Sequence, residues 1–413
     1  MSRTIKITLL LLMASQLLTA QKLVNSPFAR FGPGILEPQG AFSLRSMGGA
    51  AIGQRNGLTI NYLNPASYSA IDTNSFVFDF GLDYQFLTLK DATGDYTSDD
   101  GNFHHMLIGF PLGKKAGFAF GIVPFSSGYY NISSQVLEGD PGYDPIIGET
   151  ENLHKGTGGY NKFFFGLGIS PFKNLSVGAN MEFLFGSIFR QNTYIFLDGS
   201  NYYNNSTNET ILIRGFNFNY GLQYNLPLSN DHFATAGITY SFNKDFSAEY
   251  EALSTRYSLF SGSSYSVDTL TYTSDNTSSV KMPGGMSIGF AVGKKDKYTI
   301  AIDYTSTRWD ESNFPGYDNY LVNSNSINFG IGFIPDKFTN TGYFNRVEYR
   351  VGGHTSDSHL MINGEQIKDF GITFGVGLPL GRTNSRIDMH FEYGQRKVHL
   401  RMDCITRPII ILD

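Results

Sequence analysis

The fold is decided by residues 76–86, which read FVFDFGLDYQF. Every even position of this stretch carries Phe, Leu or Tyr, and most odd positions carry Asp, Gly or Gln. Alternation with a period of two predicts a β-strand with one apolar and one polar face. The length of the stretch, eleven residues, is about what a tilted strand needs to cross a bilayer. The stretch therefore favours a membrane-spanning strand.

The same alternation recurs along the chain, most clearly in residues 175–186, 216–224 and 298–304. A soluble β-sandwich would also alternate, but its apolar face would be rich in Val, Ile and Leu, and its outer face in Lys and Glu. Here Phe and Tyr dominate one face, and Gly, Asn, Ser and Asp the other. This pattern is typical of a transmembrane β-barrel, because each strand faces lipid on one side and a wet lumen on the other.

The composition argues against several other classes of protein. Charged residues make up 16% of the 413 residues, against about 25% in a typical soluble domain. Past the N-terminus no stretch reaches the roughly 20 apolar residues of a membrane-spanning helix, which argues against a polytopic helical membrane protein. A single Cys argues against a disulfide scaffold or a Cys-based metal site. A net charge of −5 argues against a nucleic-acid partner.

The first twenty residues have the pattern of a signal peptide. Arg3 and Lys6 precede a short apolar core at positions 7–13, and the segment ends in the small residue Ala20. The apolar core is too short for a retained membrane anchor. Because no Cys follows this core, the segment is not a lipoprotein signal. We therefore expect residues 1–20 to be removed and the protein to be exported.

Short turns rich in Pro, Gly and charged residues recur between the alternating segments. They lie at 111–115, 171–174, 227–230, 293–296, 335–337 and 379–382. Longer polar stretches separate them, at 137–158, 199–210, 244–280, 306–322 and 355–366. Short turns on one side and long loops on the other are typical of outer-membrane barrels. Six turns join twelve strands, and one strand at each end makes fourteen, although the chain after Gly394 lacks the usual amphipathic strand with a terminal aromatic residue.

Residues 21–72 do not alternate and are rich in Gly and Pro. Small residues at this density allow a chain to pack tightly in a confined space such as a lumen. The sequence thus predicts an all-β protein, a 14-stranded antiparallel transmembrane β-barrel over residues 73–413. An N-terminal hatch over residues 21–72 is expected to plug its lumen.

A family resemblance rests on this segment. The run Met47-Gly48-Gly49-Ala50 and then Asn64-Pro65-Ala66, before a long first strand, resembles the hatch of the FadL-type outer-membrane transporters of long-chain fatty acids and hydrocarbons. The chain also resembles members of this family from Bacteroidota. The resemblance implies a bacterial outer-membrane location and contact with membrane lipid. It also implies capture of a hydrophobic small molecule at the extracellular side, hatch movement, and exit through an opening in the barrel wall.

Two groups of residues are candidates for such a function. The hatch and gating group is Met47, Gly48, Gly49, Asn64, Pro65 and Ala66, for which ordinary turn chemistry is an equal alternative. The candidate ligand-capture group is Phe125, Tyr129, Tyr130, Leu259 and Phe260, which an aromatic girdle at the membrane interface would also explain.

Motifs for catalysis and metal binding were weighed and lead to no site. Residues 285–289 match Gly-X-Ser-X-Gly, but Ser287 lies inside an alternating strand and not at the strand–turn–helix elbow that this motif needs. His354 and His359 are expected in one polar loop, where a surface metal-ion site is one alternative to ordinary hydration. His104 and His105 are expected on opposite faces of a strand. We expect no enzyme, no cofactor and no metal.

A second function of another class stays open. The barrel could be a non-transporting subunit or scaffold of a multiprotein outer-membrane complex, for barrel assembly or protein secretion, with other outer-membrane proteins or lipoproteins as partners. A transporter predicts a continuous apolar pocket and a gap in the wall. A scaffold predicts a filled lumen and an apolar docking patch. A general porin would instead need a charged constriction and no hatch.

Overall fold

The computed structural model describes residues 26–90, 94–197, 202–260, 263–340, 342–381, 383–397 and 410–412. The signal peptide expected at residues 1–20 lies outside these ranges. None of the helices in the described ranges has the length and apolar character needed to span a membrane. The helices are η1 (Pro27–Arg30), α2 (Phe42–Arg45), η2 (Pro65–Ala70), η3 (Ser229–Asp231), η4 (Trp309–Glu311), η5 (Asp318–Tyr320) and η6 (Tyr343–Arg346).

Strands make up most of the described chain. They are β1 (Ile35–Leu36), β2 (Val77–Lys90), β3 (Asp95–Gly113), β4 (Ala116–Ser127), β5 (Tyr130–Val136), β6 (Thr150–Phe172), β7 (Leu175–Phe196), β8 (Asn204–Pro227), β9 (His232–Ser241), β10 (Lys244–Phe260), β11 (Ser263–Asp275), β12 (Ser279–Met282), β13 (Gly285–Lys294), β14 (Tyr298–Thr307), β15 (Ser324–Phe333), β16 (Glu348–Ile362), β17 (Glu365–Pro379), β18 (Arg386–Lys397) and β19 (Ile410–Leu412). The expected all-β class is confirmed.

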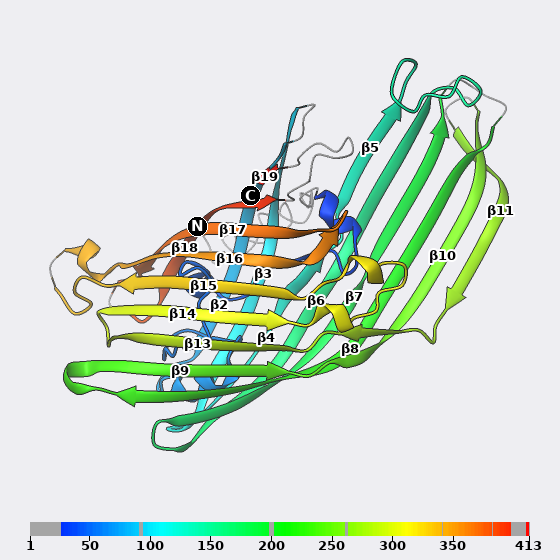
Figure 1. Cartoon of the computed structure of the whole chain (residues 1–413). Helices are drawn as coiled ribbons and strands as arrows, with labels where there is room; N and C mark the ends of the chain where they lie inside the picture. The colour runs from blue at the N-terminus through cyan, green and yellow to red at the C-terminus, as the bar shows by residue number, and fades with distance from the viewer. Residues whose placement is uncertain are drawn as a thin grey trace, which may run out of the picture.

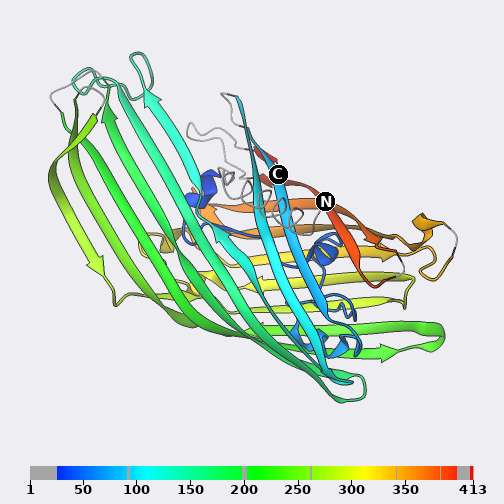
Figure 2. The same ribbon diagram turned by 180° about the vertical axis from the view of Figure 1, so that it is seen from behind.

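All nineteen strands belong to one antiparallel sheet. Neighbours in sequence pair with each other through most of it, and β9 pairs with β13 across the insertion formed by β10, β11 and β12. The three-residue β19 pairs with β18 on one side and with β2 on the other. The sheet curves so that β13–β18 lie opposite β2–β8, with the N-terminal residues between them (Figures 1 and 2).

The alternation of residues 76–86 is confirmed as a strand with an outward apolar face. Phe78, Phe80 and Tyr84 are more than half exposed, whereas Asp79 and Asp83 lie on the inner side. The other alternating segments behave in the same way. Their exposed side chains include Phe216, Phe218, Tyr220, Ile300, Ile302 and Tyr304. A sheet that exposes its Phe, Tyr and Leu side chains outward is built to contact lipid.

The short turns are confirmed at five of the six positions, each joining two paired strands. Asn174, Asn230 and Asp296 adopt positive φ there, which Asn and Asp tolerate better than most residues. The connection at 335–337 is longer than expected, because β15 ends at Phe333 and β16 begins at Glu348.

The expectation of irregular chain on the opposite side is wrong in several places. Strands β6, β7 and β8 contain 23, 22 and 24 residues, about twice what crosses a bilayer. They continue upward with β5, β10 and β11 as a tall projecting wall on one side of the molecule (Figure 1). The projecting parts contain many polar residues, for example in residues 150–159 and 204–210. The polar composition therefore indicated solvent around a strand, and not the absence of a strand.

Residues 26–76, called here the inner segment, lie inside the curve of the sheet. Tyr62, Tyr68 and Ile60 of this segment pack with Leu107 of β3 and Phe164 of β6 in one buried cluster. A larger cluster lies nearer the projecting strands, where Phe28 joins Trp309, Phe314 and Leu321. The inner segment thus supplies the apolar surface that the inward faces of the strands need.

Candidate functional site

The run Met47-Gly48-Gly49 is locked against the backbones of β15, β16 and β17. The Gly48 N–H donates to Thr373 Oγ1 at 2.9 Å, and Asn328 Nδ2 donates to the Gly48 carbonyl at 2.8 Å. A Cβ on Gly48 would overlap the carbonyl oxygens of Gly353 and Phe329. Gly48 also has φ +66°, which L-residues rarely adopt. Glycine is therefore required here by both contact and conformation.

The run Asn64-Pro65-Ala66 is fixed to the opposite side of the sheet. Asn64 caps η2, accepting a hydrogen bond from the Ala66 N–H, and is completely buried. Glycines of the facing strands leave room for this run. They are Gly168 of β6, Gly178 of β7 and Gly221 of β8, whose added Cβ atoms would overlap Asn64, Pro65 or Ala66. The two candidate hatch motifs thus contact opposite sides of the sheet and are not brought together.

Buried polar contacts hold the chain between these two runs. Asp303 of β14 accepts hydrogen bonds from the backbone N–H groups of Ala51 and Ile52, the second at 2.7 Å. The Arg55 guanidinium donates to Ser176 Oγ at 2.9 Å and to Ser69 Oγ at 3.0 Å. Burial lowers the pKa of Arg55 to about 10. Because unsatisfied buried groups are costly, Asp303 and Ser176 tie the inner segment to the strands, whereas Ser69 fixes Arg55 within the segment.

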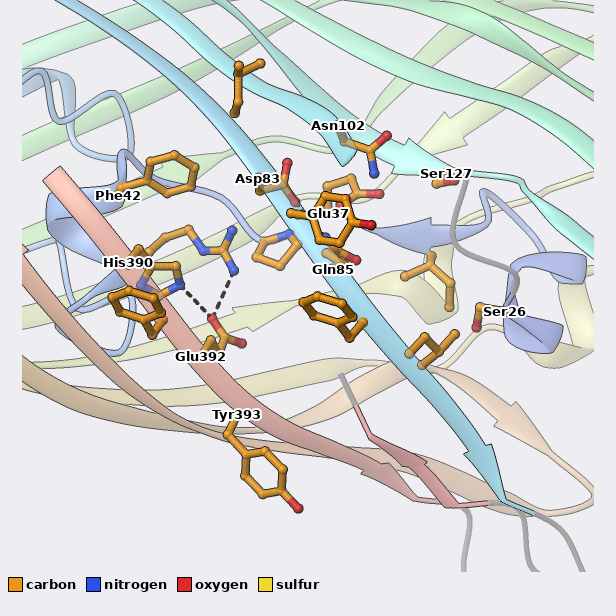
Figure 3. A pocket seen from close by; sticks show the side chains of 18 of the residues that line it. Ser26, Glu37, Phe42, Asp83, Gln85, Asn102, Ser127, His390, Glu392 and Tyr393 are labelled. Carbon is orange, nitrogen blue, oxygen red and sulfur yellow. Dashed lines mark hydrogen bonds and ion pairs between the residues drawn. The ribbon is translucent and has the colours of Figure 1, made fainter. Parts of the chain in front are cut away.

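A cavity of about 840 Å³ lies between β2, β18 and residues 26–45. Side chains from both faces of β2 line it, since Asp83 and Gln85 point inward and Leu82, Tyr84 and Phe86 outward. The same holds for β18, with His390 and Glu392 inward and Phe391 outward. Figure 3 shows this space between the two strands. A cavity bordered by both faces of its flanking strands passes through the wall.

The backbone pairing explains the opening. In the described residues β2 and β18 contact each other only through β19, which covers Thr88–Lys90 and Gln395–Lys397. Below these positions the facing edges of both strands border the cavity. Unpaired strand edges are tolerated at membrane depth only where they line protein or a cavity. Among the described residues, the cavity is therefore located at the seam between the first and last long strands, next to the three residues of β19 that pair with both.

Charged and aromatic groups converge on the inner wall of this cavity. Glu392 accepts from Arg45 at 2.9 Å and lies 3.1 Å from His390 Nε2 (Figure 3). The Phe42 ring lies 5.9 Å from that of His390 and 4.6 Å from that of His104. Helix α2 thus presents Phe42 and Arg45 to the cavity. The cavity is apolar toward the outside of the sheet and polar toward the inside.

The expectation that His104 and His105 point to opposite faces is wrong. The register of β2 and β3 shifts here, with Gly81 opposite His105 and Leu82 opposite Phe103, so His104 is an extra residue in a β-bulge. Both imidazoles are buried, their Nδ1 atoms are 2.7 Å apart, and His105 Nε2 contacts Asp79 at 3.0 Å. Such a bulge, which turns both side chains inward, cannot be predicted from the alternation of apolar and polar residues.

The candidate capture residues are only partly assembled. Tyr129 lines the cavity, Phe125 packs against the neighbouring apolar cluster, and Tyr130 is 1% exposed. Leu259 and Phe260 belong to β10, and their side chains are not among those described. A capture role for this group remains a prediction.

The motifs weighed for chemistry lie in strands. Ser287 is in β13 and accepts a hydrogen bond from Thr305 Oγ1 at 2.9 Å. His359 is in β16, not in a loop, where its ring packs against Trp309 at a tilt and contacts the Gly34 carbonyl at 3.2 Å. Among the residues described, no group of three or more His, Cys, Asp or Glu side chains is placed to hold a metal ion.

Sequence reasoning missed Arg45, Asp303, His390 and Glu392. The last two had a usable signal, because they alternate with Met389, Phe391 and Tyr393 and so had to face inward. Arg45 and Asp303 had none, since their roles depend on which part of the inner segment meets which strand.

Comparison with known proteins places the chain in a family. The sequence model of the BamG family matches residues 1–400. The chain belongs to the BamG family. No curated protein sequence matches it.

Solved structures that resemble this BamG-family chain share its fold. A Pseudomonas aeruginosa FadL homologue is 11% identical, with a TM-score of 0.58 over 92% of this chain and 96% of that one. The Ralstonia pickettii toluene transporter TbuX is 15% identical, with a TM-score of 0.57 over 91% and 97%. The Pseudomonas putida toluene transporter TodX is 16% identical, with a TM-score of 0.53 over 92% and 97%. The expected FadL-type resemblance is thus confirmed for the fold.

Proposed function

We propose that this BamG-family protein is a plugged, fourteen-stranded barrel of the bacterial outer membrane that passes small hydrophobic molecules between its lumen and the lipid. The observation that carries this proposal is the cavity between β2 and β18, which both faces of each strand line. Its volume, about 840 Å³, lies within the range of small-molecule sites.

The chemistry of the lining supports a hydrophobic or amphipathic cargo. Leu82, Phe86 and Phe391 border the outer side, where lipid tails would meet them. Arg45, His390 and Glu392 lie on the inner side, where the Glu392 carboxylate pairs with both Arg45 and His390. A molecule with an apolar body can move along the outer part without leaving an unpaired charge behind. The fold shared with a toluene transporter agrees with a hydrocarbon-like cargo, and fatty-acid-like molecules fit the same cavity.

The hatch of this proposal is residues 21–72, of which residues 26–72 belong to the inner segment, and the barrel begins at residue 73. Met47, Gly48, Gly49, Asn64, Pro65 and Ala66 are its fixed points, because each run is interlocked with glycines of the wall. Gating by movement of these six residues would break many buried contacts at once. Passage is therefore assigned to the part of the hatch that lines the cavity.

The second candidate function is a non-transporting subunit or scaffold of a multiprotein outer-membrane complex, such as one for barrel assembly or protein secretion. The projecting wall of β5–β8, β10 and β11 favours it (Figure 1). These strands extend well beyond the length that a bilayer requires. Such a surface would be available to other outer-membrane proteins or lipoproteins.

Native mass spectrometry of the particle extracted from its membrane in mild detergent separates the two functions. A single chain that carries releasable hydrophobic molecules of fatty-acid size supports passage. Stoichiometric partner proteins without any small hydrophobic molecule would overturn it and favour the scaffold. Filling the cavity with Ala29→Trp should remove the bound molecules, whereas Ala236→Trp in β9, away from the cavity lining, should leave them.

A further inference from the structure

The connection between β15 and β16 exposes three aromatic side chains on the side of the short turns. It is described over residues 334–340 and 342–347 and lies at the left end of the sheet in Figure 1. Phe338 is 76% exposed, Phe344 73% and Tyr343 41%. Large apolar side chains that are exposed together mark an interaction surface. The connection is therefore a candidate contact site that the strands themselves do not require.

Hydrogen bonds to backbone groups hold this connection in a fixed shape. The Asp336 N–H donates to the Asn345 carbonyl at 2.7 Å and so closes its base. The Arg346 guanidinium donates at 2.6 Å to the carbonyl of Gly381, in the turn before β18. On the other side the Lys297 ammonium, from the turn before β14, donates at 2.6 Å to a carbonyl at the start of the connection. The aromatic rings are thus exposed by a braced backbone.

The exposed rings continue the outer, apolar face of the sheet. Phe333 and Tyr349 lie opposite each other at the ends of β15 and β16 and are 43% and 39% exposed on that face. The Tyr349 hydroxyl donates to the Phe344 carbonyl at 3.2 Å. This bond links the connection to the outward side of β16. Aromatic side chains at the end of a lipid-facing surface are typical of the level of the lipid headgroups.

The same region has an excess of positive charge. Residues 293–298 and 334–347 together carry two carboxylates and five cations, which are Lys294, Lys295, Lys297, Lys337 and Arg346. The chain as a whole has a net charge of −5. Asp296 pairs with Lys337 at 2.5 Å, whereas Lys295 and Lys297 are exposed. Cations beside exposed aromatic rings complement the phosphate groups and acyl chains of anionic lipids.

We propose that the β15–β16 connection and the turn before β14 form a binding surface for anionic phospholipids in the membrane leaflet on the short-turn side. The rings of Phe338, Tyr343 and Phe344 enter the boundary between headgroups and acyl chains. Lys295 and Lys297 contact the phosphates. Lipid is the occupant because the rings extend a surface that already faces lipid and because the neighbouring charge is positive. This inference does not rest on the cavity between β2 and β18.

The depth of the rings is measured with a nitroxide attached to Phe338→Cys or, separately, to Phe344→Cys, both in a Cys404→Ser background. The protein is placed in vesicles of phosphatidylethanolamine and phosphatidylglycerol. Oxygen concentrates in the bilayer and a nickel chelate stays in water, so the ratio of their collision rates reports depth. Ile146→Cys, which is 79% exposed in the connection between β5 and β6, is the matched control. We expect a ratio severalfold above that of the control at both positions.

The preference for anionic lipid is measured by native mass spectrometry with added phosphatidylglycerol. Lys295→Gln with Lys297→Gln should weaken the retention of this lipid about tenfold, since each cation near an anionic surface contributes about 1 kcal/mol. Lys114→Gln with Lys115→Gln removes the same charge from the turn between β3 and β4, where both side chains are exposed. This control should retain the lipid as the wild type does.

Three results would overturn the inference. Nitroxides at positions 338 and 344 that the nickel chelate reaches as readily as position 146 would show that the rings lie in water. Protection in isolated outer membranes but not in the vesicles would assign the surface to a protein partner. An equal loss of phosphatidylglycerol from both pairs of Gln variants would show a general attraction to charge and no binding surface at this connection.

Discussion

Two parts of the inner segment sit in the same lumen and are built differently. Residues 41–71, the anchored part, press their backbone against glycines of β6–β9 and β13–β17 and place polar groups on buried partners. Residues 26–40, the leading part, line two cavities and contact β4 mainly through backbone groups. The anchored part is therefore held by close backbone contacts and buried polar groups, and the leading part by apolar packing around Phe28 and by the contacts of Arg190 and His359 with its carbonyl oxygens. The contrast teaches that one plug can combine a tightly docked part with a part that borders cavities.

The largest effect is expected from Gly48→Val in the anchored part. The added side chain overlaps the carbonyl oxygens of Gly353 and Phe329 and demands an unfavourable φ. The cost, about 4 kcal/mol or more, should prevent the folded state from forming. Folding is measured as the mobility shift of unheated samples in a denaturing gel. Gly94→Ala, where nothing lies within 4 Å of the added Cβ, should fold normally, and a folded Gly48→Val protein would contradict the interlock.

Asp303→Asn should weaken the anchored part without abolishing folding. One carboxylate oxygen now accepts from the N–H groups of Ala51 and Ile52. An amide is a weaker acceptor and brings a donor that lacks a suitable partner there, so we expect a loss of about 2 kcal/mol. Thermal unfolding in detergent measures it. The exposed Asp245 provides the control as Asp245→Asn, and equal melting temperatures for both variants would show that the anchor is dispensable.

Asn64→Ala should cost about 1–2 kcal/mol, because η2 loses its cap and the Ile52 carbonyl loses the donor at 2.9 Å. The same melting assay applies. Asn64→Asp retains the cap acceptor but places a carboxylate oxygen against the Ile52 carbonyl in a completely buried site, so its melting temperature should fall at least as far as that of Asn64→Ala. An unchanged melting temperature for Asn64→Ala would show that these two hydrogen bonds contribute little to the stability of the folded protein.

The smallest effect on stability is expected in the leading part. Leu36→Ala truncates a half-buried side chain that packs at the edge of the apolar cluster around Phe28 and borders two cavities, so the cost should be about 1 kcal/mol, below that of a fully buried Leu. Thermal unfolding in detergent measures the effect. A loss of stability as large as that of Asp303→Asn would contradict the comparison and show that the leading part is held as firmly as the anchored part.

The sequence was sufficient for the membrane-spanning parts of the strands and for most short turns, but not for the projecting ends of β6–β8 or for the lumen. Residues 76–86 predicted a strand and its outward face, since alternation is a local property of the chain. Asn174 and Asp296 likewise lay in turns that could be located from the local sequence. The partners of Asp303 and Glu392, however, are set by how a segment without periodicity docks on distant strands. The bulge at His104 and the seam between β2 and β18 depend on register, which the residue pattern alone leaves open.

The position of the inner segment at the start of the chain restricts the order in which the protein can fold. Residues 26–76 precede every long strand, yet the sheet surrounds them (Figure 2). The last contact to form along the chain, between β19 and β2, joins strands separated by more than three hundred residues. If the sheet closed before the inner segment had docked, the segment could no longer enter the lumen. The inner segment must therefore dock while the sheet is still open. The molecule must thus be assembled around its own N-terminus, with the pairing of β19 and β2 following the docking of the inner segment.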